Sequence, residues 1–263
     1  MDEAFRLRAG EGPLLVSIPH AGRTVPADIA KTMTETGRAT PDTDFFVDRL
    51  YSFAHGLGAS VLAANFSRYV VDLNRPPDDA SLYPGQFTTG LCPAVSFDGK
   101  AIYLEGQAPD AAAVKKRIAA YWKPYHEKIT EELGRIRARF GYALLWDAHS
   151  VKSRVPSLFA GTLPDFNFGT NGGASCGLAI EPAFRAVLAK NDAASYVFNG
   201  RFKGGYITRH YGRPEQGVHA IQLELAQATY MDEAANRYDD AKAARTGAVI
   251  AELMDALRKL ALH

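Results

Sequence analysis

The chain has 263 residues, of which 47% are hydrophobic and 22% charged, and its formal net charge at pH 7 is +1. This composition is typical of a globular protein with a sizeable core, and it excludes the strongly basic character of many nucleic-acid-binding proteins. No apolar run approaches the roughly 18–20 residues that span a bilayer. We therefore expect neither nucleic acid nor a membrane as a partner, and the sequence indicates no particular oligomeric state.

The cysteines and the first residues bear on the cellular compartment. Cys92 and Cys176 are the only cysteines and lie far apart in the sequence, so neither a disulfide scaffold nor a Cys-x-x-Cys zinc site is expected. The opening segment, MDEAFRLRAGEG, is acidic early and lacks the apolar core of a signal peptide. We expect a cytoplasmic, reduced protein.

Strand-like and helix-like segments alternate along the chain. In chain order we predict a strand at 13–18, a helix at 44–55, strands at 59–64 and 68–73, a helix at 111–139 that breaks near Pro124, strands at 142–147 and 157–162, a helix at 176–190, strands at 196–199 and 218–226, and a helix at 232–262. The segments 76–100 and 164–175 are rich in turn-forming residues and are predicted loops. This alternation predicts a single α/β domain over residues 1–263, with a mixed β-sheet flanked by helices.

Polar residues stand at or just beyond the ends of several predicted strands, where ligands gather in open α/β sheets. His20 follows the first strand, and His149 follows the strand that ends in Asp147. Asn74 and Arg75 follow the strand at 68–73 in the same way. Such groups can bind a metal, bind an anion or move protons, although a histidine at a strand end often serves only as a structural hydrogen-bonding residue.

A carboxylate within the last predicted strand needs a separate explanation. Glu224 lies among apolar residues, and burying an unpaired carboxylate costs several kcal/mol. It therefore needs a cation or a metal-bound water nearby. These observations suit a catalytic zinc, which takes three protein ligands and lowers the pKa of a bound water toward about 7.

We predict His20 and His149 as the imidazole ligands of a divalent metal, most simply Zn²⁺, and Glu224 as the general base. The carboxylate ligand is left open by the sequence. The candidates are Asp42, Asp44, Asp48 and Asp147. For Asp44 the structural alternative is a helix N-cap, and for Asp147 it is a position behind a ligating histidine.

Six segments together resemble the N-formylglutamate amidohydrolase, or N-formylglutamate deformylase, family. They are SIPHAG, DTDFFVDRLY, SRYVVDLNRPPDDASLYPGQ, LLWDAHS, FKGGYITRHYG and HAIQLELAQ, in unbroken order from about residue 13 to about residue 230. That family is related in fold to zinc carboxypeptidases and aspartoacylase-type deacylases. The resemblance implies a phosphorylase/hydrolase-like α/β fold, a single metal, and hydrolysis of N-formyl-L-glutamate to L-glutamate and formate in histidine degradation.

The resemblance also implies roles for individual residues. The late glutamate base of the wider group matches Glu224, its later histidine ligand matches His149, and its Asn-Arg pair for a substrate carboxylate matches positions 74–75. Its first metal motif, His-x-x-Glu, reads His-Ala-Gly-Arg at positions 20–23 and lacks the acid. We therefore take Asp44 as the carboxylate ligand in its place.

The implied substrate is a dianion, and arginine is preferred for carboxylates because its planar fork forms two parallel hydrogen bonds. We predict five substrate-binding residues: Arg68, Asn74, Arg75, Lys203 and Arg209. His210 is predicted as a second catalytic residue that hydrogen-bonds the oxyanion, with simple packing as its alternative.

Three alternatives have different consequences. Residues 173–177 fit the G-x-S-x-G pattern of a serine nucleophile, but a glycine-rich loop precedes the serine where a strand is needed. The same metal site can serve another N-acyl amino acid or a peptide or peptidoglycan fragment. A non-catalytic protein that binds an anionic metabolite would keep the arginines and would need neither the histidines nor Glu224.

Overall fold

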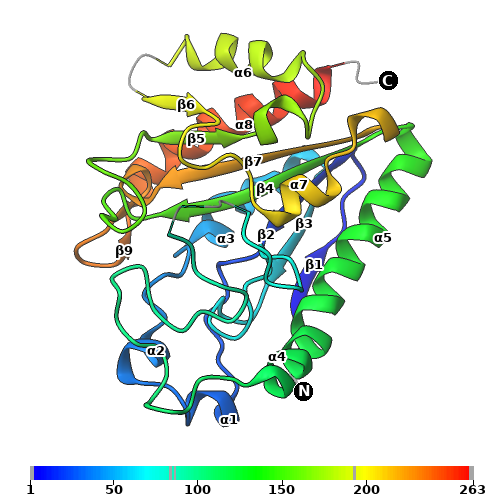
Figure 1. Ribbon diagram of the computed structural model, residues 1–263. Helices are drawn as coiled ribbons and strands as arrows, with labels where there is room; N and C mark the ends of the chain where they lie inside the picture. The colour runs from blue at the N-terminus through cyan, green and yellow to red at the C-terminus, as the bar shows by residue number, and fades with distance from the viewer. Residues whose placement is uncertain (1–2, 83–84, 86, 192–193, 261–263) are drawn as a thin grey trace.

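A seven-stranded mixed sheet forms the centre of the molecule (Figure 1). The computed structural model describes residues 3–82, 85, 87–191 and 194–260. The strands of the sheet are β1 (Phe5–Arg8), β2 (Leu14–Ile18), β3 (Ser60–Ala64), β4 (Ala143–Val151), β5 (Phe166–Gly169), β6 (Tyr196–Phe198) and β7 (Val218–Ala226), in the spatial order β1-β3-β2-β4-β7-β5-β6. Two further strands, β8 (Met231–Asp232) and β9 (Arg237–Tyr238), form a separate ribbon.

Helices cover both faces of this sheet (Figure 1). The helices are α1 (Ala27–Ala30), α2 (Glu35–Ala39), α3 (Val47–Leu50), α4 (Ala111–Arg117), α5 (Lys123–Phe140), α6 (Ile180–Leu188), α7 (Tyr206–Tyr211) and α8 (Asp240–Lys259). One core joins α6 and α8 to residues such as Val16 and Trp146, and the other joins α5 to Leu15 and Leu145. Neighbouring residues of one strand thus face opposite cores, as a strand buried on both sides requires. The predicted fold class, an α/β fold with a mixed sheet, is confirmed.

The pairing of the central strands brings their carboxyl ends together at one edge of the sheet. β2, β4 and β7 run parallel to one another, while β5 is antiparallel to β7. The carboxyl ends of the three parallel strands therefore meet at one edge. In the register of β4 with β7, His149 lies opposite Glu224 and Asp147 lies opposite Gln222. Residues about 75 positions apart in sequence are thus neighbours because of strand pairing alone.

Several predicted strands are confirmed, with shifted ends. The predictions at 13–18, 59–64, 196–199 and 218–226 correspond to β2, β3, β6 and β7. The strand predicted at 142–147 extends to Val151, so His149 lies inside β4 and not beyond its end. The prediction at 157–162 was wrong, because the strand in this region is β5, inside the segment predicted as a loop. β1 was not predicted.

The predicted strand at 68–73 is a compact turn. The amide of Val70 donates to the carbonyl of Ser67 (2.9 Å), and the amide of Asp72 donates to the carbonyl of Leu91 (2.7 Å). The β-branched residues suggested a strand, but Val71 is buried in the core between α5 and the sheet, and Val70 in a smaller cluster beside it. The prediction was wrong because side-chain burial, and not strand pairing, accounts for the apolar residues here.

The helix predictions differ mainly in their boundaries. The prediction at 111–139 is a continuous helical stretch in which a π-helical turn, Ile118–Trp122, precedes Pro124 and takes the place of a break. The prediction at 44–55 is α3 followed by a 3₁₀ helix, the one at 176–190 shortens to α6, and the one at 232–262 becomes β8, β9 and α8. Helix α7 was not predicted. In the part of the chain that the structure describes, no helix is long and apolar enough to cross a bilayer.

Candidate metal centre and substrate cavity

Three side chains with metal-ligand atoms meet at the carboxyl edge of the sheet. His20 comes from the segment after β2, His149 from β4, and Asp44 from the segment before α3, and one ligand atom from each lies within 4.8 Å of the others. All three residues are buried. The structure thus brings together the two predicted imidazoles and a predicted carboxylate in a group that can hold a metal ion.

Local hydrogen bonds place Asp44 in this group. Its backbone amide donates to the carbonyl of His20 (3.1 Å), and its Oδ2 accepts from the backbone amide of Ser150 (3.0 Å). The carboxylate is therefore tied to the ends of both β2 and β4. The alternative role as a helix N-cap is wrong, because the residue that precedes α3 is Phe46 and the Asp44 carboxylate faces the histidines.

The other three candidate carboxylates lie elsewhere. Asp42 accepts hydrogen bonds from a tyrosine hydroxyl (2.6 Å) and a backbone amide (2.8 Å). Asp48 forms an ion pair near the surface. Asp147 contacts Nε2 of His149 (3.1 Å), the ring nitrogen that points away from Asp44. Among the described residues, Asp44 is therefore the carboxylate that shares a site with both imidazoles.

Both imidazoles are oriented by an outer carboxylate. Nε2 of His20 lies 2.8 Å from Asp72, and Nε2 of His149 lies 3.1 Å from Asp147. The Nδ1 atoms of both rings face Asp44 Oδ2, at 3.9 Å for His20 and 3.2 Å for His149. Metal-binding histidines commonly donate their second ring N–H to such a carboxylate, which leaves the other nitrogen free to bind the metal. This donor set fits a divalent metal.

The electrostatics of the cluster favour a cation in the same place. Burial disfavours the imidazolium of His149, but the carboxylates of Asp147 and Asp44 outweigh burial and raise its pKa well above the ordinary value. Burial opposes ionisation of Asp72, yet Arg68 and His20 hold its pKa well below the ordinary value. Buried carboxylates therefore draw positive charge toward themselves, as a metal ion would supply.

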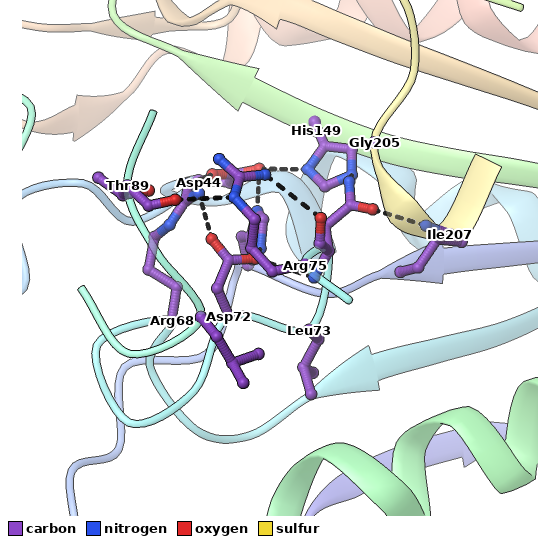
Figure 2. Close-up of polar contacts among 12 residues, drawn as sticks. Asp44, Arg68, Asp72, Leu73, Arg75, Thr89, His149, Gly205 and Ile207 are labelled. Atoms are coloured by element: carbon purple, nitrogen blue, oxygen red, sulfur yellow. Dashed lines mark hydrogen bonds and ion pairs between the residues drawn. The ribbon is translucent and has the colours of Figure 1, made fainter. Parts of the chain in front are cut away.

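Asp72 is a site residue that the sequence analysis missed. Its Oδ1 contacts His20, and its Oδ2 accepts from Arg68 Nη2 at 2.7 Å (Figure 2). Arg68, predicted to bind substrate, lines the cavity but is paired with Asp72, and its Nε has no hydrogen-bond partner among the described residues. The i, i+4 spacing of Arg68 and Asp72 was a signal, but reading the segment as a strand concealed it.

This arrangement makes Asp72→Asn a test of how His20 is held. The change removes the negative charge on the outer nitrogen of His20, and we expect metal affinity to fall about 10- to 100-fold. Metal content after equilibrium dialysis at several metal concentrations measures this. Asp42→Asn is the matched control, since it alters a buried carboxylate that contacts neither histidine. Equal metal binding by both variants would argue against the assigned role of Asp72.

Glu224 lies beside the metal-binding group and lines the same cavity. It is 8% exposed, and burial raises its pKa to about 8. Gln222 donates from Nε2 to Glu224 Oε2 (3.2 Å) and accepts from the backbone amide of Gly205 (2.7 Å). The carboxylate is thus oriented, and its affinity for a proton lies in the range useful to a general base near neutral pH.

Asn74 connects the cavity to α7. Its Oδ1 accepts from the amide of Ile207 (2.8 Å), and its Nδ2 lies 2.9 Å from Nε2 of His149. A Cβ atom on Gly205 would lie 2.4 Å from Asn74 Nδ2, so glycine is needed there for close approach. Asn74 lines the cavity as predicted, but its amide also contacts the metal-binding group.

Three predicted residues lie outside this cavity. Lys203, Arg209 and His210 are not among its described lining residues. Arg209 donates to the carbonyls of Gly204 and Leu82, and the exposed ring of His210 stacks on Tyr206 at 4.8 Å between centroids. Arg209 and His210 lie on α7, which was not predicted and whose preceding residues Ile207 and Thr208 are buried, while His210 is exposed.

Further lining residues came from segments without a recognisable motif. Thr88 and Thr89 lie in the long loop after β3, and Arg201 follows β6; all three line the cavity with Arg75. The serine-nucleophile alternative is contradicted. Ser175 is buried outside the cavity, and its hydroxyl donates to the carbonyl of Ala220 (2.8 Å).

A buried His-Asp-His group at the carboxyl edge of a mixed sheet, with a carboxylate beside it, could hold a metal ion and activate water for hydrolysis. Comparison with known proteins identifies a family of hydrolases. A model of the N-formylglutamate amidohydrolase family matches residues 12–231. The chain belongs to this family.

Relatives cover nearly its whole length. A curated protein from Pseudomonas aeruginosa, named N-formylglutamate deformylase, is 56% identical over 98% of this chain and 97% of its own. A protein of the same name from Pseudomonas putida is 49% identical over 98% of this chain and 96% of its own. The crystal structure of N-formylglutamate amidohydrolase from Ralstonia eutropha JMP134 matches with a TM-score of 0.81 and 26% identity, over 97% of this chain and 98% of that one.

Proposed function

We propose that this protein hydrolyses N-formyl-L-glutamate to L-glutamate and formate. The reaction uses a divalent metal, most simply Zn²⁺, which is held by His20, Asp44 and His149. The observation that carries the proposal is the convergence of these three residues beside Glu224 in a cavity that also presents arginines. The names of the relatives support the choice of substrate. Both cysteines are free thiols, which suits the reducing cytoplasm. The reaction is placed in histidine degradation because the family resemblance implies that pathway.

The metal-binding residues, Glu224 and Gln222 have separate roles in the reaction. A metal at this site would activate a water molecule and polarise the formyl carbonyl. Glu224 takes a proton from the attacking water, the oxygen of that water joins the formyl carbon, and the C–N bond breaks. Glu224 then returns the proton to the leaving nitrogen, so that formate and the amine of L-glutamate are released. Gln222 orients Glu224 throughout, because it contacts one carboxylate oxygen.

The proposal is tested by measuring bound metal and formate release together. Purified protein is assayed with N-formyl-L-glutamate before and after chelation, and then with added Zn²⁺, Co²⁺ or Mn²⁺, because such ligand sets accept several metals. We expect formate release to follow metal content. A panel of N-acetyl-L-glutamate, N-formyl-L-methionine and a formylated peptide tests the alternative substrates. No formate release at full metal occupancy would contradict the proposal.

Arg75 is expected to bind one substrate carboxylate. We expect Arg75→Ala to raise KM about 10- to 100-fold, since hydrogen bonds to charged groups contribute about 1.5–3 kcal/mol. The values of kcat and metal content should change little. Arg213→Ala is the control, because Arg213 is exposed and bonds backbone carbonyls outside the cavity. Steady-state kinetics of both variants decide, and an unchanged kcat/KM in Arg75→Ala would exclude the assigned contact.

A further inference from the structure

An arginine that lines the cavity has hydrogen-bonding capacity left over. Arg75 donates from Nε to the carbonyl of Thr89 (2.8 Å; Figure 2). It also donates from Nη1 to the carbonyl of Asn74 (3.3 Å). Within the described chain, it forms no ion pair with a carboxylate. Nη2 and one N–H of Nη1 are therefore available to a ligand. Carbonyl partners position the guanidinium but do not neutralise its charge.

The residue that holds Arg75 also has an unsatisfied group. Thr89 is 4% exposed and lines the same cavity, yet its Oγ1 has no hydrogen-bond partner among the residues that the structure describes. A buried hydroxyl without a partner is unfavourable, because it has lost its hydrogen bonds to water. Thr89 thus keeps a buried donor beside a cation that it orients through its own carbonyl. A ligand with acceptor oxygens would satisfy both groups.

Helix α5 and the π-helical turn before it hold the backbone of residues 73–75 in place. Trp122 donates from Nε1 to the carbonyl of Arg75 (3.0 Å), and His126 donates from Nε2 to the carbonyl of Leu73 (2.9 Å). The rings of Trp122 and His126 stack with centroids 3.8 Å apart. The backbone on both sides of Asn74 is thus held in place. A preorganised arginine loses little conformational freedom on binding an anion.

We propose that Thr89 Oγ1 donates a hydrogen bond to the substrate carboxylate that Arg75 binds, so that the two residues form one carboxylate subsite. A carboxylate has enough lone pairs to accept from a guanidinium and a hydroxyl together. The inference rests on the proposed function, because it takes N-formyl-L-glutamate as the ligand. It assigns Thr89 to substrate binding, a role that no motif in the sequence suggested.

The test uses Thr89→Val in the metal-loaded protein. Valine matches the shape of threonine but lacks the donor, and the backbone carbonyl that holds Arg75 is retained. We expect KM for N-formyl-L-glutamate to rise about 10- to 100-fold with kcat little changed, as for the loss of one hydrogen bond to a charged group. Thr89→Ser should restore KM. Thr246→Val is the matched control, since Thr246 is also buried but its hydroxyl donates to the carbonyl of Thr229 (2.7 Å) and does not line the cavity.

Two analogues show which carboxylate is bound. In 4-formamidobutanoate the α-carboxylate is missing, and in N-formyl-L-norvaline the side-chain carboxylate is missing. The effect of Thr89→Val should vanish for one of them, and the effect of Arg75→Ala should vanish for the same one. An equal effect of Thr89→Val on all three substrates, or selectivity for a different carboxylate than Arg75→Ala, would overturn the subsite.

Thermal unfolding separates binding from a structural role. Removing an unsatisfied hydroxyl should leave Tm of the ligand-free protein unchanged or higher, whereas a lower Tm with unchanged KM would overturn the inference. The proposed function fails separately, if the wild type releases no formate from any of the three compounds. In that case calorimetric binding of N-formyl-L-glutamate still tests the subsite, with an expected 10- to 100-fold weaker Kd in Thr89→Val. Equal Kd values would overturn it.

Discussion

Glu224→Gln is expected to lower kcat by about 10²- to 10⁴-fold, the usual contribution of a positioned general base. Glutamine has almost the same shape and can still contact Gln222, but it cannot accept the proton of the attacking water. Glu224 is not one of the three grouped ligand residues, so metal content should stay at the wild-type value. KM should change little, because the arginines are untouched.

The stability of metal-free Glu224→Gln also tests whether burial disfavours the ionised carboxylate. Burial raises the pKa of Glu224 to about 8, so the ionised carboxylate is unfavourable in the metal-free fold. The neutral amide should therefore leave the metal-free protein at least as stable as the wild type at pH values above 8. Pre-steady-state formate release, metal analysis and Tm together decide the role. A variant that kept a near-normal kcat would remove Glu224 from the mechanism.

Glu132→Gln is the matched control for Glu224→Gln. Glu132 is also buried, but it lies on α5 and contacts Arg135 of the same helix and Ser60, the first residue of β3. Its replacement weakens the ion pair with Arg135 and is expected to lower stability while kcat stays near the wild-type value. The two variants therefore separate loss of a proton acceptor from loss of a buried negative charge.

The parts of the site that could be predicted from sequence are those attached to regular strands. Strand β7 was predicted at its observed bounds, and Glu224 followed from its place in that strand. His20 and His149 followed from the rule that ligands gather at carboxyl strand ends. Asp44 was chosen as a substitute for the acid that is missing after His20, and residue type alone left three other acids open. Only the hydrogen bonds to His20 and Ser150 distinguish it.

The parts that could not be predicted depend on irregular backbone. Asp72 orients His20 from within a turn whose apolar residues imitate a strand, so the alternation rule assigned it wrongly. Thr89 lies in a loop that no periodicity describes, and its proposed role rests on an unsatisfied hydroxyl that the sequence does not show. His210 was predicted to contact the substrate, but it lies on helix α7, which was not predicted, and its ring faces a different surface pocket.

The largest effect on metal binding is expected for His149→Ala. The change removes one of three grouped ligands, so affinity should fall by more than the roughly 10- to 100-fold typical of an outer partner. It also leaves Asp44 and Asp147 buried without the imidazole between them. Metal content and formate release should therefore be lost together, and the metal-free variant should be less stable than the metal-free wild type.

Ligand-induced stabilisation makes this measurable without turnover. A metal at 100 times its Kd stabilises the folded state by about 2.7 kcal/mol, which raises Tm by roughly 5–10 °C for a domain of this size. At the same metal concentration the shift should be absent in His149→Ala and intact in His219→Gln, which alters another buried histidine at the opposite end of β7. If His149→Ala kept the full metal-dependent shift in Tm, His149 would not be a ligand, and the approach of both imidazoles to Asp44 would have to serve hydrogen bonding alone.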